Sequence, residues 1–268
     1  MIPTLVGVPW DASSSFERGA ALAPPRIRAA LASAAGNAWT EDLSDLSGTG
    51  MFDDAGDLAF APDESAEAAR AAIEEKIGAL LEAGRRPLVL GGDHAITWPV
   101  VRALRPRHRR LSILHVDAHP DLYDEFEGDR GSHACPFARI MEGRLADQLV
   151  QVGIRAMTGH QAEQAARFGV ETIDMRAVAA GQRPTLQHPV YVSIDLDALD
   201  PAFAPGVSHR EPGGLTTREL LSLVQNIQVP IVGADIVEYN PVRDAADLTA
   251  SVAAKLVKEM ISVMHRSG

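Results

Sequence analysis

The sequence has little of several things, and each shortage excludes a class of protein. Its single cysteine, Cys135, excludes a disulfide framework and a metal cluster held by thiolates. Basic residues number 25 against 36 acidic ones, and the net charge of -11 argues against binding to nucleic acid, whose phosphates would be repelled. No apolar run approaches the roughly 20 residues of a membrane span. The first residues lack a basic segment followed by a long apolar one, so we expect no signal peptide and a cytoplasmic location.

What is present is ordinary for a globular protein. Of the 268 residues, 46% are hydrophobic and 23% are charged, which excludes a disordered chain. We find no internal repeat or low-complexity linker, and therefore predict one domain over residues 1–268. The acidic balance is compatible with a cationic substrate or with bound metal cations.

Short apolar runs alternate with longer amphipathic stretches along the chain. Runs that are apolar on both faces are typical of parallel strands covered by helices, and they span Pro3–Val8, Pro87–Leu90, Leu111–Val116, Leu149–Gly153, Val190–Ile194 and Pro230–Ile236. The amphipathic stretches predict helices over Pro24–Ala35, Ser65–Ala83, Ile96–Leu104, Gln161–Phe168, Thr217–Asn226 and Thr249–His265. This alternation predicts an α/β fold with one doubly wound sheet.

Polar clusters follow four of the predicted strands, at Gly91–His94, Asp117–Asp121, Asp195–Asp197 and Glu238–Pro241. Because ligands of such sheets bind beyond the carboxyl ends of the strands, we expect the four clusters to share one rim. The second cluster places Asp, His and Asp at alternate positions of an extended segment, so their side chains point to one face.

Acids and histidines in three of these clusters favour a metal site. Each residue alone is more often a helix cap or a structural group than a ligand, but four carboxylates and two imidazoles together point to bound cations. Oxygen and imidazole donors without sulfur suit Mn²⁺, ahead of Mg²⁺, Co²⁺ or Zn²⁺. Four carboxylates balance two divalent cations, and two metals can activate a water molecule between them.

Three motifs carry a resemblance to a known family. GGDH at Gly91–His94, DAHPD at Asp117–Asp121 and SIDLDALDP at Ser193–Pro201 resemble the metal signatures of the ureohydrolases, which include arginases and agmatinases. The chain looks most like plant-type arginases and agmatinase-like bacterial relatives. The resemblance implies a three-layer α/β/α sandwich with a mainly parallel sheet, and a homo-oligomer that is a trimer or a hexamer.

The resemblance also implies roles for individual residues. It places one Mn²⁺ on His94, Asp117, Asp121 and Asp195, and the other on His119, Asp117, Asp195 and Asp197. His133 resembles the family's proton-shuttling histidine, and Glu238 resembles the carboxylate that holds the guanidinium. Asp121 is expected to carry a proton from the attacking water to the leaving nitrogen.

The implied activity is a binuclear manganese hydrolase that cleaves the small cationic substrate agmatine or L-arginine to urea and an amine. Alternatives are another guanidino or formimino substrate, namely guanidinobutyrate or formiminoglutamate, a single-zinc deacetylase on the same fold, and a non-catalytic binding protein. The loop Asp124–Arg130 holds four acids, which favour the ammonium of agmatine, whereas Arg130 favours the carboxylate of arginine. We expect agmatine to be preferred over arginine.

Three further polar residues are interpreted as structural. Asp93 precedes a predicted ligand and is expected to brace its turn. His115 is expected to point away from the acidic face and to lie in the core, and Cys135 is expected to be a packed small residue.

Overall fold

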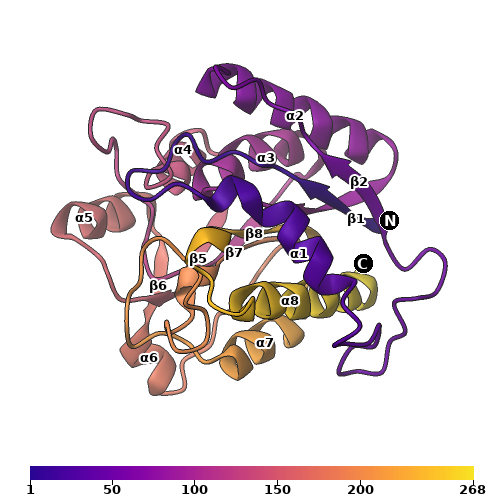
Figure 1. Ribbon diagram of the computed structural model, residues 1–268. Helices are drawn as coiled ribbons and strands as arrows, with labels where there is room; N and C mark the ends of the chain where they lie inside the picture. The colour runs from indigo at the N-terminus through magenta and orange to yellow at the C-terminus, as the bar shows by residue number, and fades with distance from the viewer.

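The computed structural model describes residues 1–268 and has one sheet of eight strands (Figure 1). In chain order the strands are β1 (Ile2–Gly7), β2 (Asp53–Asp57), β3 (Arg85–Leu90), β4 (Ser112–Val116), β5 (Gln148–Ile154), β6 (Glu171–Asp174), β7 (Val190–Asp195) and β8 (Ile231–Val237). Their order across the sheet is β2-β1-β3-β8-β7-β4-β5-β6. Every pair is parallel, which confirms the predicted doubly wound α/β sandwich.

Helices cover both faces of this sheet (Figure 1). One face packs against α1 (Ala23–Leu31), α6 (Met175–Ala179), α7 (Thr217–Gln225) and α8 (Leu248–Arg266). The other packs against α2 (Ala66–Glu82), α3 (Thr97–Leu104), α4 (Pro136–Glu142) and α5 (Gly159–Phe168). None of the helices is long and apolar enough to cross a lipid bilayer.

The central strands supply both apolar layers because their side chains alternate between the two faces. On β3, Leu88 and Leu90 lie in the core beneath α1 and α8, whereas Val89 lies in the core beneath α2 and α3. All seven residues of β8 are buried. Burial on both faces explains why these strands are continuous apolar runs in the sequence.

The sequence missed the two edge strands. Each of the six predicted strands overlaps an observed one, but β2 and β6 were not predicted. Their sequences, DDAGD and ETID, are polar and partly exposed because an edge strand is covered less completely than a central one. The short helices α4 and α6 were missed for a similar reason, since five to seven residues are too few to show a helical period.

A glycine joins the strand ends that carry the polar clusters. Gly92, just after β3, donates its N–H to Val8 O and accepts a hydrogen bond from the N–H of Glu238. A Cβ atom at this position would lie 1.7 Å from the carbonyl oxygen of Trp10. Only glycine therefore allows the segments after β1, β3 and β8 to approach this closely.

We predict that Gly92→Ala lowers the free energy of unfolding by about 3 kcal/mol, the upper end of the usual cost of overpacking, because a backbone carbonyl must move. Gly78→Ala is the matched control, since a Cβ atom there meets nothing within 4 Å in the middle of α2. That change should add roughly 0.5–1 kcal/mol through helix propensity. Denaturant unfolding of both variants measures the difference, and equal stability would contradict the prediction.

Candidate metal centre

The four polar clusters meet because they follow four neighbouring strands, β3, β8, β7 and β4. The carboxyl ends of parallel strands lie at one edge of a sheet, so residues far apart in the sequence converge there. Asp93 caps the 3₁₀ helix His94–Ile96 and also accepts a hydrogen bond from the N–H of Ser13, which ties the β3 end to the loop after β1. Asp93 thus braces the turn that presents His94.

His94 faces three carboxylates. Its Nδ1 lies 3.2 Å from Asp117 Oδ2, 3.1 Å from Asp121 Oδ2 and 3.2 Å from Asp195 Oδ2. The ring is fully buried, and Nδ1 has no hydrogen-bond partner. A buried nitrogen surrounded by carboxylate oxygens is the arrangement expected around a metal cation.

A buried hydrogen-bond chain fixes the form of this imidazole. Ser193 Oγ donates its single hydrogen to Asp235 Oδ1 at 2.7 Å, so it can only accept from His94 Nε2, which lies 2.9 Å away. Asp235 also accepts hydrogen bonds from Thr97 and Tyr191. The proton of the neutral ring is therefore on Nε2, and Nδ1 presents a lone pair, as a metal ligand must.

The second group of candidate ligands lies beside the first. His119 Nδ1 lies 3.0 Å from Asp197 Oδ2 and 3.5 Å from Asp117 Oδ1. Backbone N–H groups hold one oxygen of each carboxylate: His119 N donates to Asp117 Oδ1, Asp197 N to Asp195 Oδ1 and Ala118 N to Asp197 Oδ1. The other oxygen of each is thereby oriented toward a histidine, so the cluster is preorganised.

The pKa values of the clustered carboxylates also indicate a site for cations. Burial, with repulsion from Asp117, raises the pKa of Asp197 to about 6. Burial, with repulsion from Asp197 and Asp117, raises the pKa of Asp195 well above its ordinary range. Because buried carboxylates repel one another unless a positive charge separates them, the residues present fit divalent metal ions.

His115 lies in the core, as expected, but the prediction that it points away from the acidic face is wrong. Its Nε2 lies 2.7 Å from Asp117 Oδ2, and its Nδ1 lies 3.0 Å from Gln151 Nε2. The ring stacks on Phe137 at a centroid distance of 3.8 Å. His115 therefore positions Asp117 from beneath. The two residues are two positions apart on β4 and its continuation, so the alternation of an extended segment places both side chains on the same face.

His133 and Glu238 are also brought together at this rim. His133 Nδ1 lies 3.0 Å from Glu238 Oε1, and His133 Nε2 lies 2.8 Å from Ser15 Oγ. Although burial opposes protonation, the carboxylate of Glu238 raises the pKa of His133 to about 9. Glu238 Oε1 also accepts from His94 N, whereas no hydrogen bond within the chain reaches Oε2. Glu238 thus keeps one oxygen available to a cationic ligand.

Asp121 and Glu238 share a rare backbone conformation. Their φ angles are +50° and +63°, in the left-handed region that non-glycine residues seldom occupy. Such strain persists only where the surrounding structure enforces it, and it concentrates at functional sites.

A cavity of about 160 Å³ opens at the cluster. Its lining includes residues of the cluster, His119, Asp121, Asp195, Asp197 and Glu238, together with Ser15, Tyr123, Phe126, His133, Gln161 and His209. His209 was not singled out from the sequence, because a single histidine in a glycine- and proline-rich loop gives no periodic signal.

The acids of the loop Asp124–Arg130 were expected to face the substrate, but they do not line the cavity. Asp124 pairs with Arg130 at 2.6 Å and with Arg139 at 2.9 Å, and Glu142 lies 3.0 Å from both arginines. These four residues form a closed ring of charges against α4. From this loop Tyr123 and Phe126 line the cavity, whereas its acids and Arg130 do not.

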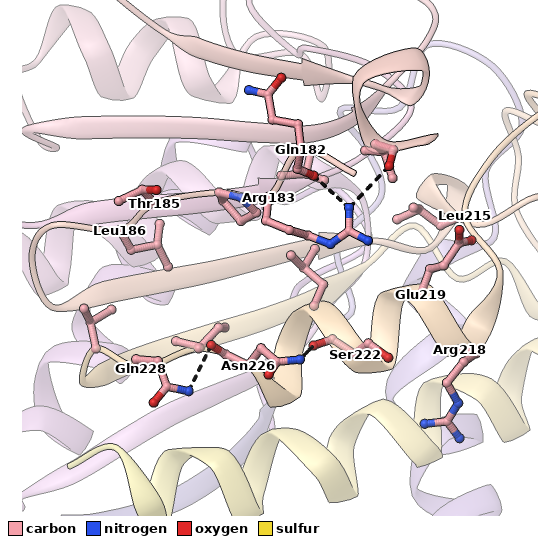
Figure 2. Close-up of a pocket in the computed structure, with 16 residues that line it drawn as sticks. Gln182, Arg183, Thr185, Leu186, Leu215, Arg218, Glu219, Ser222, Asn226 and Gln228 are labelled. Carbon is pink, nitrogen blue, oxygen red and sulfur yellow. Dashed lines mark hydrogen bonds between the residues drawn. The ribbon is translucent and has the colours of Figure 1, made fainter. Parts of the chain in front are cut away.

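A second hollow, of about 490 Å³, lies between α6 and α7 (Figure 2). Its lining includes the apolar side chains of Val152, Leu186 and Leu215. In Figure 2 the side chain of Arg183 extends across the middle of the view, and Arg218 lies to one side. The hollow contains no histidine and only one acid, Glu219, whose side chain caps α7. Nothing in this hollow resembles the metal cluster.

Comparisons with known proteins agree with the site. The family model "Arginase family" matches residues 3–262. "Arginase, mitochondrial" from Medicago truncatula is 49% identical over 98% of this chain and 82% of its own length. "Agmatinase" from Bacillus anthracis is 35% identical over 96% and 90%. The solved structure "Arginase from Medicago truncatula" superposes with a TM-score of 0.92 at 47% identity, covering 98% of this chain and 87% of that one.

The fold and these similarities define a hydrolase of the class that acts on guanidino C–N bonds. Within that class, the chain belongs to the arginase family and is similar to plant arginases. The resemblance inferred from the three motifs is confirmed.

Proposed function

We propose that this protein hydrolyses the guanidino group of L-arginine to urea and ornithine, with two Mn²⁺ per chain. The observation that carries the proposal is the bare Nδ1 of His94 among three carboxylates, at the rim where Glu238 keeps Oε2 free. The reaction needs metal ions to activate water and a carboxylate to bind the guanidinium. The cluster around His94 can supply the first, and Glu238 can supply the second.

A guanidinium is a delocalised cation and therefore a poor electrophile. Bound Mn²⁺ ions would lower the pKa of a water molecule and so provide a strong nucleophile near neutral pH. Within the chain, Glu238 Oε2 holds the guanidinium through charge-assisted hydrogen bonds. Asp121 carries a proton to the leaving nitrogen, and His133 relays protons between the cavity and solvent through Nε2, beside Ser15.

The donor set supports two manganese ions rather than one zinc ion. All six candidate ligands are imidazoles or carboxylates, which suit Mn²⁺, and none is a thiolate. His94 and His119 each face their own group of carboxylates, and Asp117 reaches both. A single-zinc deacetylase would leave the group around His119 and Asp197 without a cation.

The substrate's far end distinguishes arginine from agmatine. The acidic loop was expected to attract the ammonium of agmatine, but Asp124 already pairs with Arg130 and Arg139. The higher identity to a plant arginase also supports arginine. Agmatine is the second candidate because the agmatinase relative aligns over 96% of the chain.

We also propose a homo-oligomer, a trimer or a hexamer. The hollow in Figure 2 has hydrophobic side chains in its lining, Leu186 and Leu215 among them, that a second copy of the chain would cover. Light scattering that gives the mass of one chain would contradict this proposal. The cytoplasmic location remains a prediction that cell fractionation can check.

Urea release tests the proposed reaction. The Mn²⁺-loaded protein should have a higher kcat/KM for L-arginine than for agmatine, because the acids that line the cavity are Glu238 and three candidate metal ligands, which leaves none for the ammonium. Guanidinobutyrate, formiminoglutamate (whose product is formamide) and an acetylated lysine test the alternatives. If none of the guanidino compounds yields urea, the proposed function is wrong.

Bound metal can be counted in ligand variants. Asp117→Ala should lose both Mn²⁺ ions and all activity, because Asp117 lies in both groups of ligands. Asp197→Ala should retain one ion, since Asp197 contacts only His119 among the two ligand histidines. Asp147→Ala removes a carboxylate at the opposite end of the sheet and is the control. An active Asp117→Ala protein without metal would refute the assignment.

A proton relay that binds no metal should be separable from the ligands. His133→Asn should therefore retain two Mn²⁺ per chain and lose turnover by a factor on the order of 10². Metal content and kcat measured on the same preparation check both parts. Loss of metal from this variant would mean that His133 is a ligand rather than a relay.

A further inference from the structure

His209 is the one histidine of the cavity wall that has no assigned role. Its side chain is half-buried and lies 5.3 Å from the ring of His133, 6.0 Å from His119 and 5.6 Å from Phe16, between ring centroids. No hydrogen bond within the chain involves either ring nitrogen. Both nitrogens are therefore available to a ligand in the cavity.

The segment around His209 is fastened on both sides. Ser208 Oγ donates to Glu17 O at 2.7 Å and accepts from Asn240 Nδ2 at 2.9 Å. On the other side, Arg155 donates to Glu211 O at 2.6 Å. These bonds anchor the loop to the segments after β1, β5 and β8. The imidazole is thus held in place at the cavity although it has no partner of its own.

We propose that His209 contacts the guanidino group of the substrate and determines selectivity for it. This inference rests on the proposed function. Neutral imidazole carries one nitrogen that accepts a hydrogen bond, and a guanidinium has donors in its plane. Glu238 accepts hydrogen bonds from one edge of that group. His209, which lies beside His133 and His119, accepts a hydrogen bond from another edge.

The position of His209 favours the guanidino head over the substrate's tail. It is a neighbour of His119, which is a candidate metal ligand, and of His133, which contacts Glu238. Tyr123 and Phe126, which also line the cavity, pack against each other with tilted rings at a centroid distance of 5.1 Å. A guanidino head at the metal cluster therefore lies near His209, because His209 is a neighbour of the candidate ligand His119.

Binding of small probes tests this assignment without relying on turnover. Methylguanidine presents the head without the tail, and ornithine presents the tail without the guanidino group. On the Mn²⁺-loaded protein, His209→Phe should weaken methylguanidine roughly tenfold, as expected for one lost hydrogen bond to a charged group, and leave ornithine unchanged. Titration calorimetry or ligand-observed NMR measures both dissociation constants.

Two further variants separate hydrogen bonding from shape. His209→Asn keeps a donor and an acceptor and should recover most of the affinity that His209→Phe loses. His108→Phe, in the loop before β4 at the opposite end of the sheet, should change neither dissociation constant. Metal content should be unchanged in all three. In urea release, KM should rise by the same factor for arginine and agmatine, because both carry the guanidino head.

The outcomes distinguish the inference from the proposed function. Wild-type protein that binds methylguanidine through His209 but yields no urea would overturn the proposed reaction and support this contact. The contact itself is overturned if wild-type protein does not bind methylguanidine. It is also overturned if His209→Phe binds methylguanidine as tightly as wild type, or if only ornithine is affected.

Discussion

The crowding of buried negative charge at one edge of the sheet is the constraint on which this structure depends. Asp117, Asp195 and Asp197 are almost completely buried within a few ångströms of one another. Burying an unpaired charge costs several kcal/mol. Three such costs together are comparable to the whole free energy of unfolding of an ordinary protein. Backbone N–H groups compensate one oxygen of each carboxylate, and the remaining oxygens leave a place for cations.

Other features follow from holding these charges in place. The chain His94–Ser193–Asp235 determines which nitrogen of the imidazole is bare. His115 contacts Asp117 from the core side. Gly92 permits the close approach of three segments, and left-handed backbone at Asp121 and Glu238 aims two carboxylates at the cavity.

The sequence predicted the parts of this molecule that local patterns encode. Apolar runs identified the six buried strands, and the alternation of acids and histidines identified the ligand cluster. Contacts between residues that are far apart in the sequence were not predicted. The expectation that His115 points away from Asp117 is contradicted by strand alternation itself, which places residues two positions apart on one face. The composition of Asp124–Arg130 suggested an acidic cavity mouth, but Arg139, a residue of α4, pairs with Asp124. His209 gave no signal because its importance arises only from its neighbours in space.

The sheet order has a consequence for biosynthesis. The residues of the rim come from β3, β4, β7 and β8, and β8 inserts between β3 and β7, which are separated in sequence by about a hundred residues. A nascent chain that lacks β8 has a gap in the middle of its sheet, and it also lacks Glu238. Two half-sheets cannot close around the cluster until nearly the whole chain has been synthesised. A translation product that ends before β8 therefore lacks both the strand that closes the sheet and a residue of the site.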